Sequence, residues 1–152
     1  MSYLDKNLIP GEEIAFRTKK NLILFLMPVV WTIITLFFYI NSNPIVVKIG
    51  FIPAIATAVV WINGWLDYVT SEFAVTNKRV FMKEGFFFRH INETQLRTIS
   101  NVTINQSLIG RIMNYGTVWV NTFGGENDPF TEIASPNEFQ KQVQIQLDKV
   151  GK

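Results

Sequence analysis

The sequence predicts an α+β membrane protein in which a two-helix transmembrane hairpin precedes a small antiparallel β-rich domain ending in an amphipathic helix. Three observations predict this fold class. Two uncharged apolar runs lie in the first half of the 152-residue chain, at Leu22–Ile40 and Ile49–Leu66. After Asp67, apolar and polar side chains alternate with the two-residue period of strands. After Ser135, apolar residues recur with the spacing of one helix face.

The two apolar runs have the length of membrane-spanning helices. The first contains 19 residues, and a helix of that length rises about 28 Å, close to the thickness of a bilayer's hydrocarbon core. Between the runs, Asn-Ser-Asn-Pro gives a turn and places Pro44 at a helix start. The length of the first run, the lack of a small-residue cleavage site and the second run argue against a signal peptide. A buried soluble core is the remaining alternative.

Charged and aromatic residues around the runs predict the orientation. Arg17, Lys19 and Lys20 precede the first run, whereas the connecting loop offers only Lys48. The positive-inside rule therefore places both termini in the cytoplasm, with the protein as a two-span component of the cell (inner) membrane. Aromatic residues near the end of the second run fit an interfacial belt of anchors. These residues are Trp61, Trp65 and Tyr68.

These features divide the chain into three parts. Residues 1–20 form a cytoplasmic segment, residues 21–67 the transmembrane hairpin, and residues 68–152 the β-rich domain. In the first part, Ile14 and Phe16 alternate with charged or small residues. Such alternation is typical of an edge strand or of a segment lying along the membrane interface, and both interpretations stay open.

Turn signals separate at least five short strands in the β-rich domain. The expected strands lie near Phe73–Val75, Val80–Met82, Phe86–Ile91, Thr98–Asn105, Thr117–Phe123 and Phe130–Ala134. Ser107–Met113 is expected to form a short helical turn, with Arg111 either on its outer side or reaching back to a carbonyl. Gly116 then lets the backbone re-enter the sheet at an unusual φ. Three side chains of this connection are expected to face inward: Leu108, Ile112 and Tyr115.

The C-terminal segment predicts an amphipathic helix. Ser135-Pro136-Asn137-Glu138 has the pattern of a capping box with proline at the first helical position. One apolar stripe follows, formed by Phe139, Val143, Leu147 and Val150. We expect this stripe to dock on the sheet, because its opposite face is rich in Gln and Lys.

Three motifs carry a resemblance to a known family. They are LIPGEEIAFRTKK before the first run, FAVTNKRVFMKEGFFFR after the second, and QSLIGRIMNYGTVWV. With the order of two spans, strands and helix, they make the chain similar to bacterial membrane proteins with a pleckstrin-homology-like (PH-like) domain, once catalogued as a domain of unknown function. The resemblance covers nearly the whole chain. It implies a PH-like antiparallel β-barrel or sandwich at the cytoplasmic face, with no catalytic residues to carry over.

Composition argues against several kinds of chemistry. The chain has no cysteine and a single histidine, His90, which excludes thiolate metal sites, cysteine nucleophiles and histidine clusters. From Asp67 onward it has nine basic and nine acidic residues, whereas nucleic-acid-binding domains are usually markedly basic. We therefore expect no enzyme activity, no cofactor, no metal and no nucleic acid.

Two binding functions remain after these exclusions. The favoured one is a non-enzymatic adaptor or scaffold for membrane-protein assembly, binding another protein or a copy of itself. Its candidate partner surface consists of Phe87 and Trp119. The alternative is a sensor of anionic lipid headgroups at the inner leaflet. Its candidate contacts are the basic residues Lys78, Arg79, Lys83 and Arg89.

Overall fold

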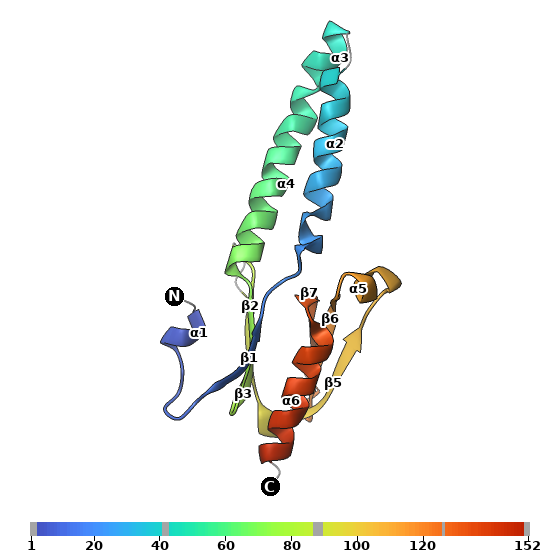
Figure 1. Ribbon diagram of the computed structural model, residues 1–152. Coiled ribbons are helices and arrows are strands. Elements are labelled where there is room, and N and C mark those ends of the chain that lie inside the picture. Colours follow the sequence, from blue (N-terminus) through green and yellow to red (C-terminus); the bar gives the residue numbers. More distant parts are fainter. Residues whose placement is uncertain (1–2, 41–42, 87–89, 126, 151–152) are drawn as a thin grey trace. The chain divides into compact units, whose positions relative to one another are not determined.

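The computed structural model describes residues 3–40, 43–86, 90–125 and 127–150. The chain forms two compact units (Figure 1). The sheet unit combines Met1–Asn21 with Thr70–Lys152, and the helical unit contains Leu22–Val69. The segment before the apolar runs therefore belongs to the β-rich unit, and the helical unit is inserted into it.

A four-stranded antiparallel sheet forms one layer of the sheet unit. Its order is β1 (Ile14–Thr18), β2 (Glu72–Thr76), β3 (Arg79–Glu84) and β4 (His90–Gln95). Strand β1 is an edge strand that pairs with β2 across the insertion. In this structure residues Ile14–Thr18 of the N-terminal segment form an edge strand. A short helix, α1 (Tyr3–Lys6), precedes β1, and Leu4 is fully buried against Ala74 and Phe81.

A three-stranded antiparallel sheet forms the second layer. Its strands are β5 (Ile99–Asn105), β6 (Tyr115–Thr122) and β7 (Asn127–Ala134). A 3-10 helix, η2 (Leu96–Thr98), leads from the first sheet into β5, and α5 (Leu108–Ile112) connects β5 with β6. Among the described residues the two sheets are joined by an isolated bridge and do not close into a barrel. The fold is therefore a sandwich, and the barrel alternative is wrong.

Helix α6 (Pro136–Val150) covers the core between the two sheets. Phe139 and Val143 are fully buried and pack with residues of both sheets, as predicted. Val150 is 37% exposed, so the predicted stripe stops one turn early. The helix begins at Pro136, but Ser135 has a φ of 53°, outside the extended region of an N-cap. Its hydroxyl accepts a hydrogen bond from the side chain of Asn114 instead.

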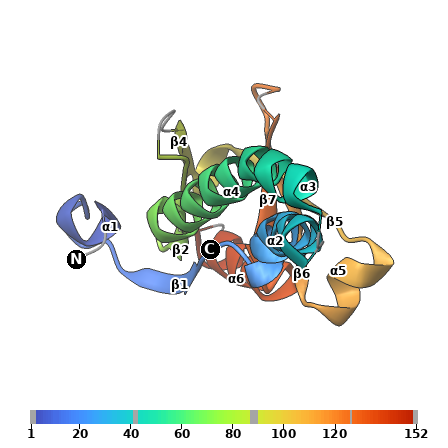
Figure 2. The same ribbon diagram turned by 90° about the horizontal axis from the view of Figure 1, so that it is seen from above.

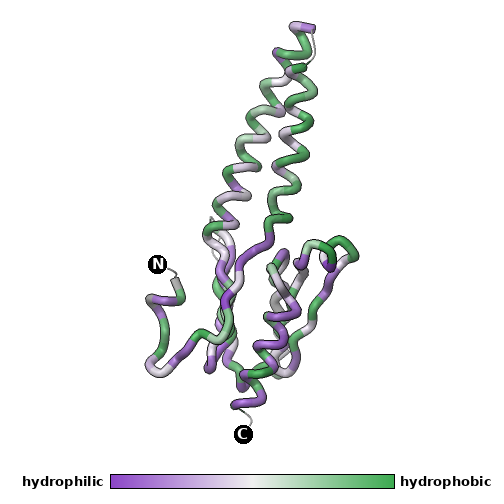
Figure 3. The backbone as a smooth tube through the Cα atoms, viewed as in Figure 1, coloured by the Kyte–Doolittle hydropathy of each residue, from purple (hydrophilic) through white to green (hydrophobic). Residues whose placement is uncertain are grey.

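The helical unit contains two long apolar segments (Figure 3). Its elements are η1 (Leu22–Phe25), α2 (Leu26–Ile40), α3 (Pro44–Ile49) and α4 (Phe51–Thr70). The segments Leu22–Ile40 and Pro44–Thr70 are long and apolar enough to cross a membrane. The second is therefore longer than predicted, because the helix begins at Pro44, next to the N-cap Asn43.

Helices α2 and α4 run side by side and are joined by polar contacts (Figures 1 and 2). The hydroxyls of Thr35 and Thr57 lie 2.7 Å apart, and Trp61 Nε1 donates to Thr32 Oγ1 at 3.0 Å. Hydrogen bonds between helices and small residues at the contact are typical of helix pairs in membranes. Such contacts are what an apolar pair needs where lipid supplies no hydrophobic driving force.

The strand register gives the sheet unit two distinct ends. We call the end where Thr18 pairs with Phe73 the exit end, because the chain leaves the unit after Asn21 and returns at Thr70. The opposite end, at the turn of Asn77 and Lys78, is the far end. The exit end also includes the α5 side of β6, because Gly116 pairs with Ile133 and Ile133 bridges Lys20.

Candidate functional site

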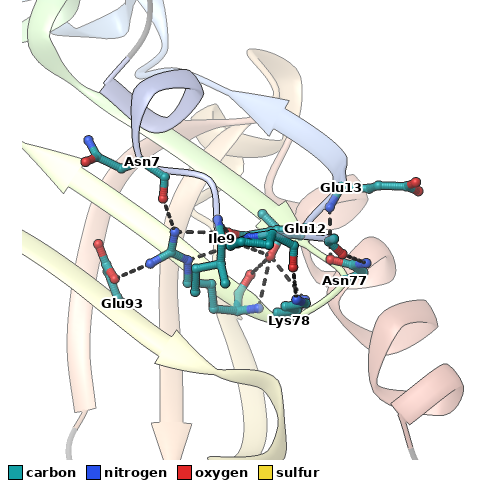
Figure 4. Close-up of polar contacts among 11 residues, drawn as sticks. Asn7, Ile9, Glu12, Glu13, Asn77, Lys78 and Glu93 are labelled. Carbon is teal, nitrogen blue, oxygen red and sulfur yellow. Dashed lines mark hydrogen bonds and ion pairs between the residues drawn. The ribbon is translucent and has the colours of Figure 1, made fainter.

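Glu12 fastens the N-terminal segment to the turn between β2 and β3 (Figure 4). Its carboxylate accepts hydrogen bonds from Arg79 Nε at 2.9 Å and from Arg79 Nη2 at 3.0 Å. The hydroxyl of Thr76 and the backbone N–H of Ile9 each donate to it at 2.8 Å. The two family motifs that flank the helical unit in the sequence therefore meet in this contact.

The Arg79 guanidinium donates all of its described hydrogen bonds within the sheet unit. Besides Glu12, it donates through Nη1 to Glu93 at 2.5 Å and through Nη2 to the carbonyl of Asn7 at 2.7 Å. The side chain is only 10% exposed. The hydrogen bond to Glu12 raises the pKa of Arg79 above its ordinary value. Arg79 is thus a buried cation that holds three segments together.

The pKa of Glu12 follows from two opposed effects. Burial raises it, because water no longer solvates the carboxylate. Hydrogen bonds from Arg79, Ile9 and Thr76 lower it and outweigh burial, so the pKa lies below its ordinary value. Both partners are charged at neutral pH, and the contact is an ion pair.

The turn residues complete this attachment. Asn77 donates through Nδ2 to the carbonyl of Gly11 at 3.1 Å and accepts from the N–H of Glu13 at 3.0 Å. Lys78 Nζ donates to the carbonyl of Pro10 at 2.6 Å. The polar turn between β2 and β3 is therefore hydrogen-bonded to the Pro10–Gly11 segment. They also give Lys78 a structural contact in addition to any ligand role.

A cavity of about 460 Å³ opens at the far end beside this attachment. Lys78 and Arg97 are its cationic lining residues outside the Glu12–Arg79 pair, and Glu93 is its carboxylate. The remaining walls come from Ile9, Asn77, Gln95, Leu96 and Val150. The cavity is therefore of mixed charge rather than a strongly basic pocket.

The structure separates the predicted basic residues. Lys78 and Arg79 belong to the far end, whereas Lys83 pairs with Glu72 at the exit end. Arg79 and Lys83 are four positions apart on β3, which corresponds to about 13 Å. Arg89 lies outside the described residues. A headgroup role for these residues stays a prediction, but they do not form one cluster.

A second concavity runs between the edge of β5 and the first turns of α6. We call it the β5–α6 groove, and its volume is about 620 Å³. Its lining residues are Asn101–Gln106, Arg111, Asn137 and Gln140. The lining is predominantly polar. Along the strand, asparagine and threonine residues alternate with Val102 and Ile104, and Gln106 follows. Sequence reasoning did not single out these residues, although the sequence NVTINQ alternates visibly.

The backbone of β5 faces this groove. Gln140 Nε2 donates to the carbonyl of Val102 at 2.6 Å, so that carbonyl points away from β6 and toward α6. Backbone groups two residues apart on a strand point the same way. The N–H and C=O of Ile104 therefore also face the groove. In the described part of the sheet β5 pairs with β6 alone, so no second strand lies on this edge, where Gln140 occupies the Val102 carbonyl.

The predicted partner and anchor residues have the following surroundings. Trp119 lies half-buried on the outer face of the second sheet, opposite Thr103 and Pro129. Phe87 lies outside the described residues. In the helical unit, Trp65 is 61% exposed, whereas the ring of Tyr68 contacts Phe25. Their roles as partner surface and interfacial anchors stay predictions.

The connection between β5 and β6 differs from its prediction. Leu108 and Ile112 are almost fully exposed instead of facing inward, and Tyr115 is half-buried. The residue that packs inward is Gly110. Gly116 does not have a positive φ; a Cβ there would approach Gln106 Cγ to 2.7 Å, so close packing is what requires glycine. The inward assignment of Leu108 and Ile112 is wrong because α5 packs through Gly110, which turns both side chains outward.

The sequence matches the bacterial PH domain over residues 14–147, and the chain belongs to that family. The match begins at β1 and ends within α6, so it includes the inserted helical unit. No curated protein and no solved structure matches the chain at a significant level. PH domains are modules that bind lipids or proteins, and the sheet unit supplies such a module.

Proposed function

We propose that the protein is a membrane-anchored, non-enzymatic adaptor whose PH domain binds an extended segment of another membrane protein on the cytoplasmic side. The observation that carries this proposal is the β5–α6 groove, where an open strand edge faces a helix. Extended peptides add to exposed sheet edges through main-chain hydrogen bonds, and flanking pockets select their side chains.

The chemistry of the groove suits a polar peptide strand. Asn101, Thr103 and Asn105 stand along the strand, and Asn137 and Gln140 line the opposite wall. Amide and hydroxyl groups both donate and accept hydrogen bonds, so they match a peptide backbone without requiring a charge. Arg111 at one end adds a cation that favours a carboxylate in the partner.

Membrane anchoring rests on the helical unit. Two segments of 19 and 27 residues reach mean hydropathies of 2.4 and 2.2, and few of their residues are buried within the protein. Tethering confines the adaptor and its partner to one surface, which raises the effective concentration of a weak binder. An adaptor of modest intrinsic affinity is therefore effective in this setting.

The test uses the full chain in its membrane, with a photoreactive amino acid at Asn137 in the groove. A control places the same group at Lys141, an exposed position on the same helix outside the groove lining. We expect a protein adduct from position 137 and none of the same mass from position 141. The identified partner is then purified and its affinity for the chain is measured after reconstitution.

Edge pairing is tested with Ile104→Pro, which removes an N–H that faces the groove. Proline is tolerated on an edge strand where its nitrogen faces away from the ladder. Ile104→Ala is the matched control, because it loses the same packing and keeps the N–H. We expect the proline variant to lose partner binding and the alanine variant to retain it. Equal affinities would overturn strand addition at β5.

One observation supports the alternative function, a sensor of anionic lipid headgroups. Lys83 is the register partner of Glu72 and therefore belongs to the exit end, where the chain joins the apolar helices, whereas Lys78 and Arg79 belong to the far end. Each basic residue near an anionic surface contributes on the order of 1 kcal/mol. A single residue of this kind orients the domain but supplies little selectivity.

A further inference from the structure

Helix α5 presents its apolar side to solvent. Leu108, Ile109 and Ile112 are 79%, 59% and 86% exposed, and Met113, directly after the helix, is 47% exposed. At about 100° per residue these four side chains fall within an arc of about 140°. They therefore form one continuous apolar surface, which we call the α5 tip.

The orientation of α5 is fixed by its glycine. Gly110 is buried, and a Cβ there would lie 2.7 Å from the carbonyl oxygen of Tyr115. The Ser107 hydroxyl accepts a hydrogen bond from the Gly110 N–H at 3.0 Å and caps the helix. Only a residue without a side chain fits against the sheet, so the apolar side chains must point outward. Their exposure is thus a consequence of the packing of α5.

The α5 tip is bonded to Asn21, the residue that precedes the first apolar segment in the chain. Asn21 Nδ2 donates to the carbonyl of Met113 at 3.0 Å, and the Asn21 N–H donates to the carbonyl of Glu132 at 2.6 Å. Leu22, the next residue, begins the 19-residue apolar segment. A residue that is one peptide bond away from a membrane span lies at the bilayer surface. The tip, bonded to that residue, lies there as well.

We propose that the α5 tip inserts its apolar side chains into the headgroup–acyl boundary of the membrane that the helical unit crosses. The proposal rests on the proposed membrane anchoring. Short apolar surfaces of this kind bury about 5–10 Å deep at the boundary. Arg111 is exposed on the flank of the helix, at the end of the β5–α6 groove, and does not interrupt the apolar surface.

The occupant is lipid because the tip adjoins the point where the chain enters the membrane. The hydrogen bond from Asn21 Nδ2 to the Met113 carbonyl fixes the tip to the residue one peptide bond before the span. A protein partner at the same place would have to displace lipid from around that entry. Insertion also gives the PH domain a third attachment to the membrane besides its two covalent connections, which limits its rotation about them.

The experiment uses the full chain in liposomes and single cysteines carrying an environment-sensitive fluorophore. The native chain has no cysteine, so each label is unique. Ile112→Cys reports on the tip and Leu36→Cys reports on the first apolar segment. Phe123→Cys is the matched control, because Phe123 is 78% exposed and directly follows β6 at the end opposite the α5 tip. The length of β6 from Tyr115 to Thr122 is about 23 Å.

We expect quenching by spin-labelled lipid and loss of iodide quenching at positions 112 and 36, and the reverse at position 123. If position 36 is quenched by lipid but position 112 by iodide, the insertion proposal is overturned and anchoring stands. Iodide quenching at position 36 would instead overturn the anchoring. A label at position 112 shielded from both quenchers means that protein covers the tip, which also overturns insertion into lipid.

Discussion

Arg79 and Glu12 form a bidentate ion pair, although they are 67 positions apart in the sequence. The whole helical unit is inserted between these two residues. The pair therefore links the two chain segments of the sheet unit, which are otherwise joined by the short β1–β2 pairing. Its side chains are 10% and 0% exposed, so it belongs to the interior of the unit.

Glu12→Gln should destabilise the sheet unit strongly. The substitution leaves Arg79 buried with a neutral partner, and removing one member of a buried pair costs about 3–5 kcal/mol. Glu13→Gln is the control, because Glu13 is exposed and uses only its backbone in this contact. Denaturant unfolding of the full chain in detergent measures both variants, followed by the fluorescence of Trp119 in a background where Trp31, Trp61 and Trp65 are replaced by Phe. Equal midpoints would contradict a stabilising role for the pair.

Stability should also depend on acid pH through Glu12. Its pKa is lower in the folded chain than in the unfolded chain. The carboxylate therefore stabilises the fold fully above the ordinary glutamate pKa of about 4.3, and this contribution is lost as the pH falls through the folded-state pKa. The raised pKa of Arg79 keeps that side chain charged throughout this window. We expect the unfolding free energy to fall more steeply below about pH 4.3 in the native chain than in Glu12→Gln. Parallel curves would contradict the assignment.

Gly110→Ala should destabilise the sheet unit despite the higher helix propensity of alanine. A Cβ at this position meets the Tyr115 carbonyl oxygen at 2.7 Å, a backbone atom that cannot move aside without disturbing β6. The propensity gain is only about 1 kcal/mol, and overpacking of this kind costs about 1–3 kcal/mol. Gly124→Ala is the control, because its nearest contact is an ordinary 3.8 Å to Thr122 Oγ1. Thermal unfolding of both variants decides, and a stabilised Gly110→Ala would contradict the packing of α5.

Much of the fold follows from local patterns in the sequence. Strands form where Phe73, Val80 and Val118 predict them. In β6, which contains Val118, buried and half-buried residues alternate, whereas β2 and most of β3 are buried on both faces because Leu4 packs against Ala74 and Phe81. Phe139 and Val143 recur with helical spacing and dock as expected. The apolar segments are recognisable from length alone. In β6 and α6 the side-chain period is set by one buried face, so sequence and structure agree there.

The remaining features depend on contacts between distant segments. No local pattern shows that Arg79 turns inward, because a basic residue after a turn is usually solvated; its partner Glu12 belongs to another motif. The sequence does not predict the exposure of Leu108 and Ile112 either, since apolar residues are normally assigned to the core. The β5–α6 groove requires the placement of Gln140 on an edge carbonyl, which only the folded chain gives.

If the lipid alternative holds, charge reversal should matter more at Lys83 than at Lys78. Lys83 belongs to the exit end, whereas Lys78 belongs to the far end and donates to Pro10. Lys83→Glu should weaken the preference of the full chain for anionic over neutral nanodiscs by about 5- to 30-fold. The reversal removes one attraction and adds one repulsion, each on the order of 1 kcal/mol. Lys78→Glu is the matched variant. A larger effect at Lys78 would show that the far-end cavity meets the lipid.

The sheet unit should fold without the helical unit only if both of its chain segments are present. A fragment of residues 70–152 lacks β1 and Glu12, so Arg79 loses its main partner and β2 becomes an exposed edge. Joining residues 1–21 to residues 70–152 by about eight Gly/Ser residues restores both, because such a linker spans about 15 Å and the two segments already pair at Thr18 and Phe73. We expect the joined protein to be soluble with a cooperative unfolding transition and the fragment to be unfolded or aggregated. Cooperative unfolding of the fragment alone would show that residues 1–21 are dispensable, and that the ion pair between Glu12 and Arg79 does not close the unit.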